Sequence, residues 1–151
     1  MKPNRSFRLW PWLLALAAEA YLYVSYQQND GRFHWFLHFF VGASASFIVM
    51  GLMMWWSERI IRHPLLWIFV GHVIAMFPDI LWNFLVATHQ PWMDVFLVHI
   101  AAHFIPGRNW TWYAIFLASL TFYLYQRAVK EAAAIGPLED LRGSVGAVKA
   151  G

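Results

Sequence analysis

The sequence contains no cysteine, which excludes disulfide bonds and thiolate metal ligands. Charged residues are also scarce: they make up 13% of the chain, about half the share of an ordinary soluble domain. Lys and Arg are spread over flanks and loops, so they do not form a nucleic-acid-binding surface. Hydrophobic residues reach 60% and aromatic residues 19%, more apolar surface than a soluble protein of 151 residues can bury. The composition therefore predicts an integral membrane protein.

Four stretches of the chain meet the requirement of about 20 mostly apolar residues for a transmembrane helix. They are residues 9–27, 34–57, 64–88 and 110–126. Pro78 lies inside the third stretch, where its missing N–H and its ring predict a kink. The expected fold class is therefore all-α, an integral membrane four-helix bundle.

A further apolar stretch, residues 92–105, precedes the last predicted span and ends at Pro106-Gly107. Its polar residues are Asp94, His99 and His103. As an α-helix it would reach only about 21 Å, which is too short to cross a bilayer. We therefore expect an extra interfacial or re-entrant half-helix before the last span.

The distribution of Lys and Arg around the predicted spans indicates the topology, because these residues are enriched in cytoplasmic loops. With the N-terminus inside, seven basic residues lie on the cytoplasmic side: Lys2, Arg5, Arg8, Arg59, Arg62, Arg127 and Lys130. Two lie on the other side: Arg32 and Arg108. This asymmetry predicts a multi-pass protein of a bacterial inner membrane with both termini cytoplasmic. Residues 1–126 would form the transmembrane domain, and residues 127–151 a cytoplasmic tail that is helical to about Ala134 and loosely ordered beyond it.

Ionisable side chains within the spans are candidates for function, because burying them in a bilayer is costly. The predicted topology brings six ionisable residues, from the spans and from the chain between the last two spans, to the outer half of the bundle: His34, His38, Asp79, His89, His99 and His103. Two His pairs, each four residues apart, and one carboxylate are the ligand chemistry of zinc, manganese or iron. We predict a divalent-metal site, most simply for zinc, with the following ligands: His38, Asp79, His99 and His103. His34 or His89 is an alternative ligand or a hydrogen-bond partner of a ligand.

Structural roles are the alternative interpretation of these residues. A His near the end of a span can be a simple interfacial residue, and Asp79 could cap the helix that resumes after Pro78. Glu19 stands apart, in the middle of the first span. His72 and Ser46 lie near the same depth, so we expect Glu19 to be protonated or to pair with one of them.

Three features of the sequence resemble the membrane-bound metal-dependent hydrolases, a family of small inner-membrane proteins that includes a LexA-regulated member. They are, in order, His38-Phe39-Phe40-Val41-Gly42, then Met76-Phe77-Pro78-Asp79-Ile80, then the pair His99 and His103. The resemblance covers about residues 34–107, and His89-Gln90-Pro91 stands in place of a longer His-containing signature of the family. It implies metal-dependent hydrolysis with Asp79 and the paired His at the site.

Three functions are consistent with these features. The first is metal-dependent hydrolysis of a lipid or lipid-linked ester at the outer face, with Asp79 or His89 as the catalytic base. The second is a non-catalytic subunit of a larger membrane complex, which the small size and the many Trp and Phe residues would suit. The third is b-type haem binding by His38 and His72, although these lie at different depths and one haem needs both at one level. The expected partner is membrane lipid, and not nucleic acid.

Overall fold

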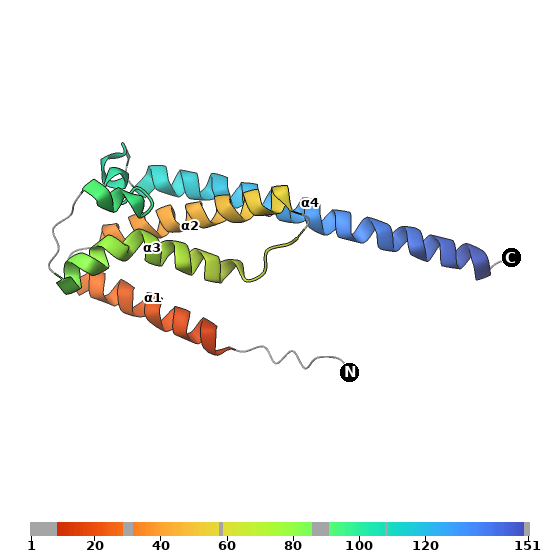
Figure 1. Cartoon of the computed structure of the whole chain (residues 1–151), viewed down its shortest axis with the longest axis horizontal. Helices are drawn as coiled ribbons and strands as arrows, with labels where there is room; N and C mark the ends of the chain where they lie inside the picture. The colour runs from red at the N-terminus through yellow and green to blue at the C-terminus, as the bar shows by residue number, and fades with distance from the viewer. Residues whose placement is uncertain (1–8, 29–31, 58, 86–90, 108, 150–151) are drawn as a thin grey trace.

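The structure, a computed structural model, describes residues 9–28, 32–57, 59–85, 91–107 and 109–149. Within these residues the chain is all-α, with four α-helices, two short 3-10 helices and no strand. The elements are α1 (Trp10–Gln28), α2 (Arg32–Trp56), α3 (Pro64–Leu85), η1 (Pro91–Val95), η2 (Ala101–Phe104) and α4 (Asn109–Lys149). α1 and α3 run in one direction, and α2 and α4 in the other (Figure 1). Residues 91–107 therefore lie at the end of the bundle where α2 and α4 begin.

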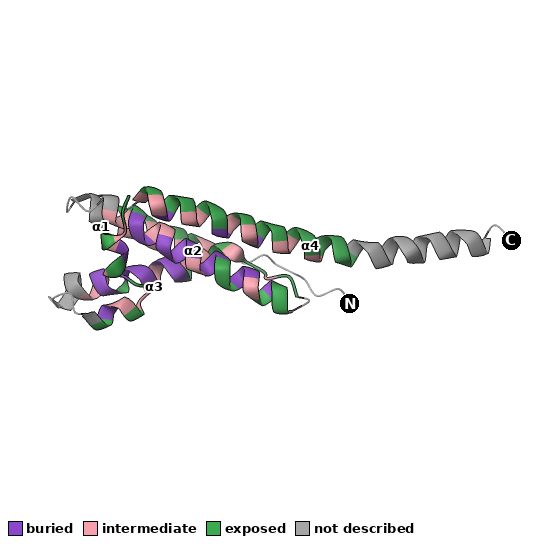
Figure 2. Ribbon diagram, turned by 90° about the horizontal axis from the view of Figure 1, so that it is seen from above, coloured by how far each residue is buried: buried purple, intermediate pink, exposed green. Residues whose placement is uncertain are grey.

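α2 is the central helix, because it packs against α1, α3 and α4. Buried positions follow one another along most of its length, whereas α4 is mainly half-buried or exposed (Figure 2). One buried cluster joins the middle and the end of α2 to α4: Ala43, Phe47, Met50, Met54 and Tyr123. A second cluster joins the beginning of α2 to α3, η2 and α4: Leu37, Val41, Ala75, Ala102 and Trp112.

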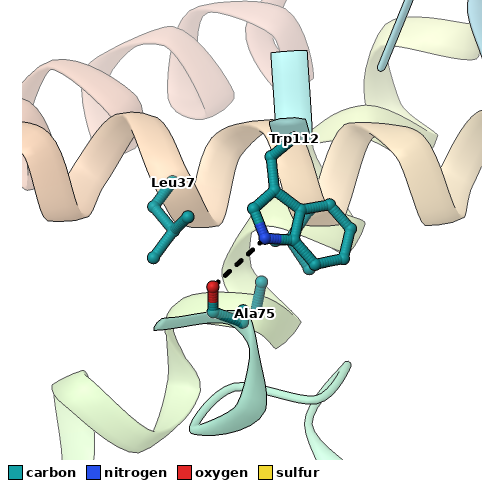
Figure 3. Packing of buried hydrophobic residues seen from close by; sticks show 5 residues of the cluster. Leu37, Ala75 and Trp112 are labelled. Carbon is teal, nitrogen blue, oxygen red and sulfur yellow. Dashed lines mark hydrogen bonds between the residues drawn. The ribbon is translucent and has the colours of Figure 1, made fainter. Parts of the chain in front are cut away.

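Trp112 ties the segment that contains η2 to the helical bundle. Its indole Nε1 donates a hydrogen bond of 3.3 Å to the carbonyl of Ala102, beside Leu37 and Ala75 (Figure 3). Because a buried indole N–H needs an acceptor, this bond fixes the ring and the backbone of η2 together. Ala102 itself packs in an apolar cluster with residues of α2, α3 and α4.

α2 and α3 approach closely where each carries a glycine. A Cβ added to Gly42 would lie 2.5 Å from backbone atoms of Gly71 and His72, so no larger residue fits without separating the helices. Ser46, one turn further along α2, donates from its hydroxyl to the carbonyls of Gly42 at 2.9 Å and Trp67 at 2.7 Å. The small residues of α2 thus allow the close approach of α3.

Two of the described helices are long and apolar enough to cross a membrane: α2 over His34–Trp56 and α3 over Pro64–Leu81. This property weakly indicates membrane association, because the core helix of a soluble protein can share it. The stretches at 9–27 and 110–126 are helical, within α1 and α4, but their placement in a membrane stays a prediction.

Two expectations about local structure are wrong. Residues 92–105 do not form one half-helix, because Leu97 and Val98 adopt positive φ angles of 55° and 53° that separate η1 from η2. The C-terminal region does not become irregular after Ala134, because α4 continues as one helix to Lys149. That helix includes Gly136 and Pro137.

Candidate metal centre

The Asp79 carboxylate lies between three imidazole rings at the end of the bundle. Its Oδ2 is 3.3 Å from Nε2 of His34 and 3.2 Å from Nε2 of His38, both on α2. Its Oδ1 is 3.2 Å from Nε2 of His99, in the segment between η1 and η2. Each of these rings therefore presents the same nitrogen, Nε2, to one carboxylate.

The helical spacing on α2 and the packing of α3 against α2 account for this convergence. His34 and His38 are one turn apart on α2, so both side chains lie on the face that α3 packs against. Asp79 follows Pro78 in α3 and is 5% exposed. Each imidazole that contacts Asp79 can donate a proton toward its carboxylate and so helps to compensate the negative charge.

A fourth imidazole completes the cluster. His103, in η2, lies with its ring centroid 4.4 Å from that of His34, in an edge-to-face arrangement. One ring nitrogen from each of His34, His38, His99 and His103 lies within 4.8 Å of the others. His38 and His99 are fully buried and stack at 4.4 Å, whereas His34 and His103 are half-buried. The cluster therefore has an inner pair and an outer pair, and it could hold a metal ion.

The orientation of His99 is fixed by its second nitrogen. Nδ1 donates a hydrogen bond of 2.9 Å to the carbonyl of Ala75, in the turn of α3 that Pro78 interrupts. Because Nδ1 carries the proton, Nε2 either offers a lone pair to a cation or carries a second proton toward Asp79. Burial alone would lower the pKa of His99. The hydrogen bond to Asp79 and its negative charge outweigh this effect, so the pKa lies above its ordinary value. A ligating His with its other N–H on a backbone carbonyl is a common arrangement in metal sites.

The distances and the donor set fit a small divalent ion. Two ligand atoms bound at about 2.0–2.2 Å to a tetrahedral ion lie about 3.3–3.6 Å apart. The separations of 3.2–3.3 Å between the Asp79 oxygens and the imidazole nitrogens are close to that value. Nδ1 of His38 is buried and makes no hydrogen bond within the described part of the chain. Four imidazoles and a carboxylate exceed the four ligands of a closed zinc site, so one donor could remain outside the coordination shell.

The structure brings together the predicted ligands His38, Asp79, His99 and His103, and it adds His34 to the same cluster. His34, which the sequence left as an alternative ligand, contacts Asp79 as directly as His38 does. His89, the other predicted catalytic residue, lies outside the described residues.

Asp94 is a residue near the site to which the sequence analysis assigned no role. Its Oδ1 accepts hydrogen bonds from the backbone N–H groups of Ile100 at 2.7 Å and Ala101 at 3.0 Å. An acidic residue a few positions before a His pair, in an otherwise apolar stretch, was the available signal.

A second polar contact joins α1 to α3. Both carboxylate oxygens of Glu19 approach Nδ1 of His72, at 2.8 and 2.9 Å. Of the two partners predicted for Glu19, His72 and Ser46, the structure therefore shows His72. His72 is fully buried, and its ring lies perpendicular to those of Trp35 and Phe39. The pair links α1 to α3, while Ser46 bonds to backbone carbonyls instead.

The two His of the haem hypothesis have separate partners. His38 stacks on His99 and faces Asp79, and His72 pairs with Glu19. A haem between His38 and His72 would have to displace both sets of contacts.

The chain matches no known family model, no curated protein and no solved structure. The resemblance to membrane-bound metal-dependent hydrolases therefore rests on the three sequence features alone.

Proposed function

We propose that this chain is an integral protein of a bacterial inner membrane that binds one divalent metal ion at the His/Asp cluster. Zinc is the default ion, because imidazole and carboxylate ligands suit it. The observation that carries the proposal is the shared Asp79 carboxylate, contacted by imidazoles from α2 and from the segment after α3. Such a buried arrangement is costly unless a cation or protons compensate it.

The exposed aromatic residues support the placement in a membrane. At one end of the bundle Trp10 begins α1 and Trp55 and Trp56 end α2, all between 58% and 78% exposed. At the other end Trp92 and Trp110 are 56% and 78% exposed. Tryptophan is enriched at both surfaces of a bilayer, where its ring meets apolar chains and its N–H meets water. The exposed apolar side chains between these levels, such as Leu13, would then face lipid.

Hydrolysis of a lipid or lipid-linked ester is the reaction that this site would suit. A divalent ion bound there would act as a Lewis acid and activate water. His38, His99 and Asp79 would hold the ion from the buried side. His34 and His103 form the half-exposed side of the cluster, so substrate would approach from there. A carboxylate or imidazole that stays outside the coordination shell could accept a proton from water.

Metal analysis of the detergent-purified chain tests the proposal. About one zinc ion per chain should remain after dialysis, because several charged or imidazole ligands bind zinc tightly. Asp79→Ala and His99→Ala should each lose this ion and remain monodisperse. His63→Ala is the matched control, because His63 is exposed in the loop between α2 and α3 and should not affect metal content. Full metal content in both site variants would refute the proposal, and a Soret band would favour haem instead.

The second candidate is a non-catalytic subunit of a larger membrane complex. The observation in its favour is the number of exposed aromatic side chains on outward faces, among them Phe36, Tyr113 and Tyr125. Purification in mild detergent separates the two functions. Stable co-purification with other membrane proteins, together with no bound metal, would favour the subunit.

A further inference from the structure

Two consecutive residues before His99 adopt a backbone conformation that is unfavourable for them. Leu97 and Val98 have φ angles of 55° and 53°, in the left-handed region that glycine adopts most readily. For a β-branched residue such as Val98 this conformation is a genuine outlier. Strained backbone persists only where the surrounding structure holds it in place, and it is concentrated at functional sites.

Asp94 provides the hydrogen bonds that hold this turn. Its backbone carbonyl accepts from the N–H of Val98 at 2.8 Å, and its side-chain Oδ1 accepts from Ile100 and Ala101 at 2.7 and 3.0 Å. One aspartate therefore contacts the backbone on both sides of His99. The turn ends where the N–H of Ala102 bonds to the carbonyl of Val98 at 2.8 Å.

The turn determines where the His99 side chain points. His99 is fully buried, with Nδ1 on the Ala75 carbonyl and Nε2 on Asp79. A regular helix through Leu97 and Val98 would rotate and displace residue 99 relative to α3, because each residue in a helix turns the chain by about 100°. The left-handed conformation of Leu97 and Val98 and the two backbone hydrogen bonds to the Asp94 side chain act together. They place His99 against α3 and His103 beside His34.

We propose that Asp94 is a positioning residue for the metal site, which acts through the strained turn at Leu97 and Val98 and not as a ligand. The inference rests on the proposed metal-binding function. Removal of the Asp94 carboxylate leaves two backbone N–H groups without their acceptor, and the turn relaxes toward negative φ. His99 then loses its alignment with Asp79, and the ion loses one buried ligand.

The experiment compares Asp94→Ala with Asp94→Asn in the full chain in detergent. Asn keeps an oxygen acceptor for the two amides, so its zinc affinity should stay within about threefold of that of the natural chain. Ala removes the acceptor and should lower zinc affinity at least about tenfold, as the loss of an outer-sphere partner commonly does. Glu131→Ala is the control for removing a carboxylate, because Glu131 forms an exposed pair with Arg127 on α4.

A glycine substitution tests the link through the strained turn. Val98→Gly allows positive φ without a Cβ clash, so the turn should depend less on Asp94. Asp94→Ala should therefore cost less zinc affinity in the Val98→Gly background than in the natural chain. This double variant also serves if Asp94→Ala alone does not fold.

Hydrogen exchange separates this inference from the metal proposal. The amides of Ile100 and Ala101 should exchange faster in metal-free Asp94→Ala than in the natural chain, and remain protected in Asp94→Asn. Faster exchange in a chain that never binds zinc would support the positioning of the turn and refute the metal function. Unchanged exchange, or equal affinity losses with and without Val98→Gly, would overturn the role of Asp94.

Discussion

Gly42→Ala should weaken metal binding although residue 42 is not a ligand. The added Cβ would lie 2.5 Å from backbone atoms of Gly71 and His72, whereas ordinary contacts lie at 3.4–4 Å. The backbone atoms cannot rotate away, so α2 and α3 must separate by about 1 Å at this level. Overpacking of this kind typically costs about 1–3 kcal/mol.

The separation bears directly on the site because His38 lies one turn before Gly42 on α2, and Asp79 lies on α3. A displacement of about 1 Å would extend the contact of 3.2 Å between His38 and Asp79 to about 4 Å. Metal–ligand distances vary by only about 0.2 Å, so the ion would lose a ligand or strain the helices. We expect zinc affinity to fall at least about tenfold, equivalent to about 1.4 kcal/mol. A competition titration with a chromophoric chelator measures this change.

Gly51→Ala is the matched control for Gly42→Ala. Gly51 is on the same helix and equally tight, but the added Cβ would meet the ring of Phe122, a side chain that can turn aside. It faces α4, away from the cluster, so metal affinity should remain unchanged. If Gly42→Ala binds zinc as tightly as Gly51→Ala and the natural chain do, the geometric link between the helix contact and the site is refuted.

Three further predictions concern pH, packing and topology. The hydrogen bond and charge of Asp79 raise the pKa of His99, so zinc must displace a proton from this ring; zinc affinity should therefore rise, and protons should be released, as pH increases above the range in which an ordinary imidazole titrates. A pH-independent titration would contradict this. Glu19→Ala leaves buried His72 without its partner and should lower the thermal midpoint in detergent more than Glu131→Ala, which removes an exposed pair worth at most about 1 kcal/mol. Single cysteines at Val95 and Arg62, in a chain that has none of its own, should label from opposite sides of the membrane, and labelling from one side would refute the topology.

The helices and the convergence of the His/Asp cluster were largely predictable, because their signals are periodic. Apolar stretches of suitable length place α1, α2 and α3 to within a few residues. The spacing of four between His34 and His38 puts both on one face of a helix, whatever its partner. The carboxylate after Pro78 was recognisable because an acidic residue in an apolar stretch needs compensation.

The segment that completes the site was predictable only in its position. Leu97 and Val98 are apolar residues that favour regular structure, and nothing local to them indicates positive φ. Their conformation depends on Asp94 and on the packing of residues 101–104 beneath Trp112, which are tertiary effects. For the same reason the sequence offered both His72 and Ser46 as partners for Glu19, whereas the fold selects His72.

The order in which the chain is synthesised has a consequence for the Asp79 carboxylate. The two His of α2 precede Asp79 in the chain, and His99 and His103 follow it. If α3 inserts into a membrane as proposed, two imidazoles would therefore already be available for its acidic residue during synthesis. Those early partners would give Asp79 a polar contact before the later pair has been synthesised, and the later pair would then enclose it. In the placement that we propose, the cluster would thus first favour the insertion of α3 and would become a complete ligand set only after the last connection before α4 has been synthesised.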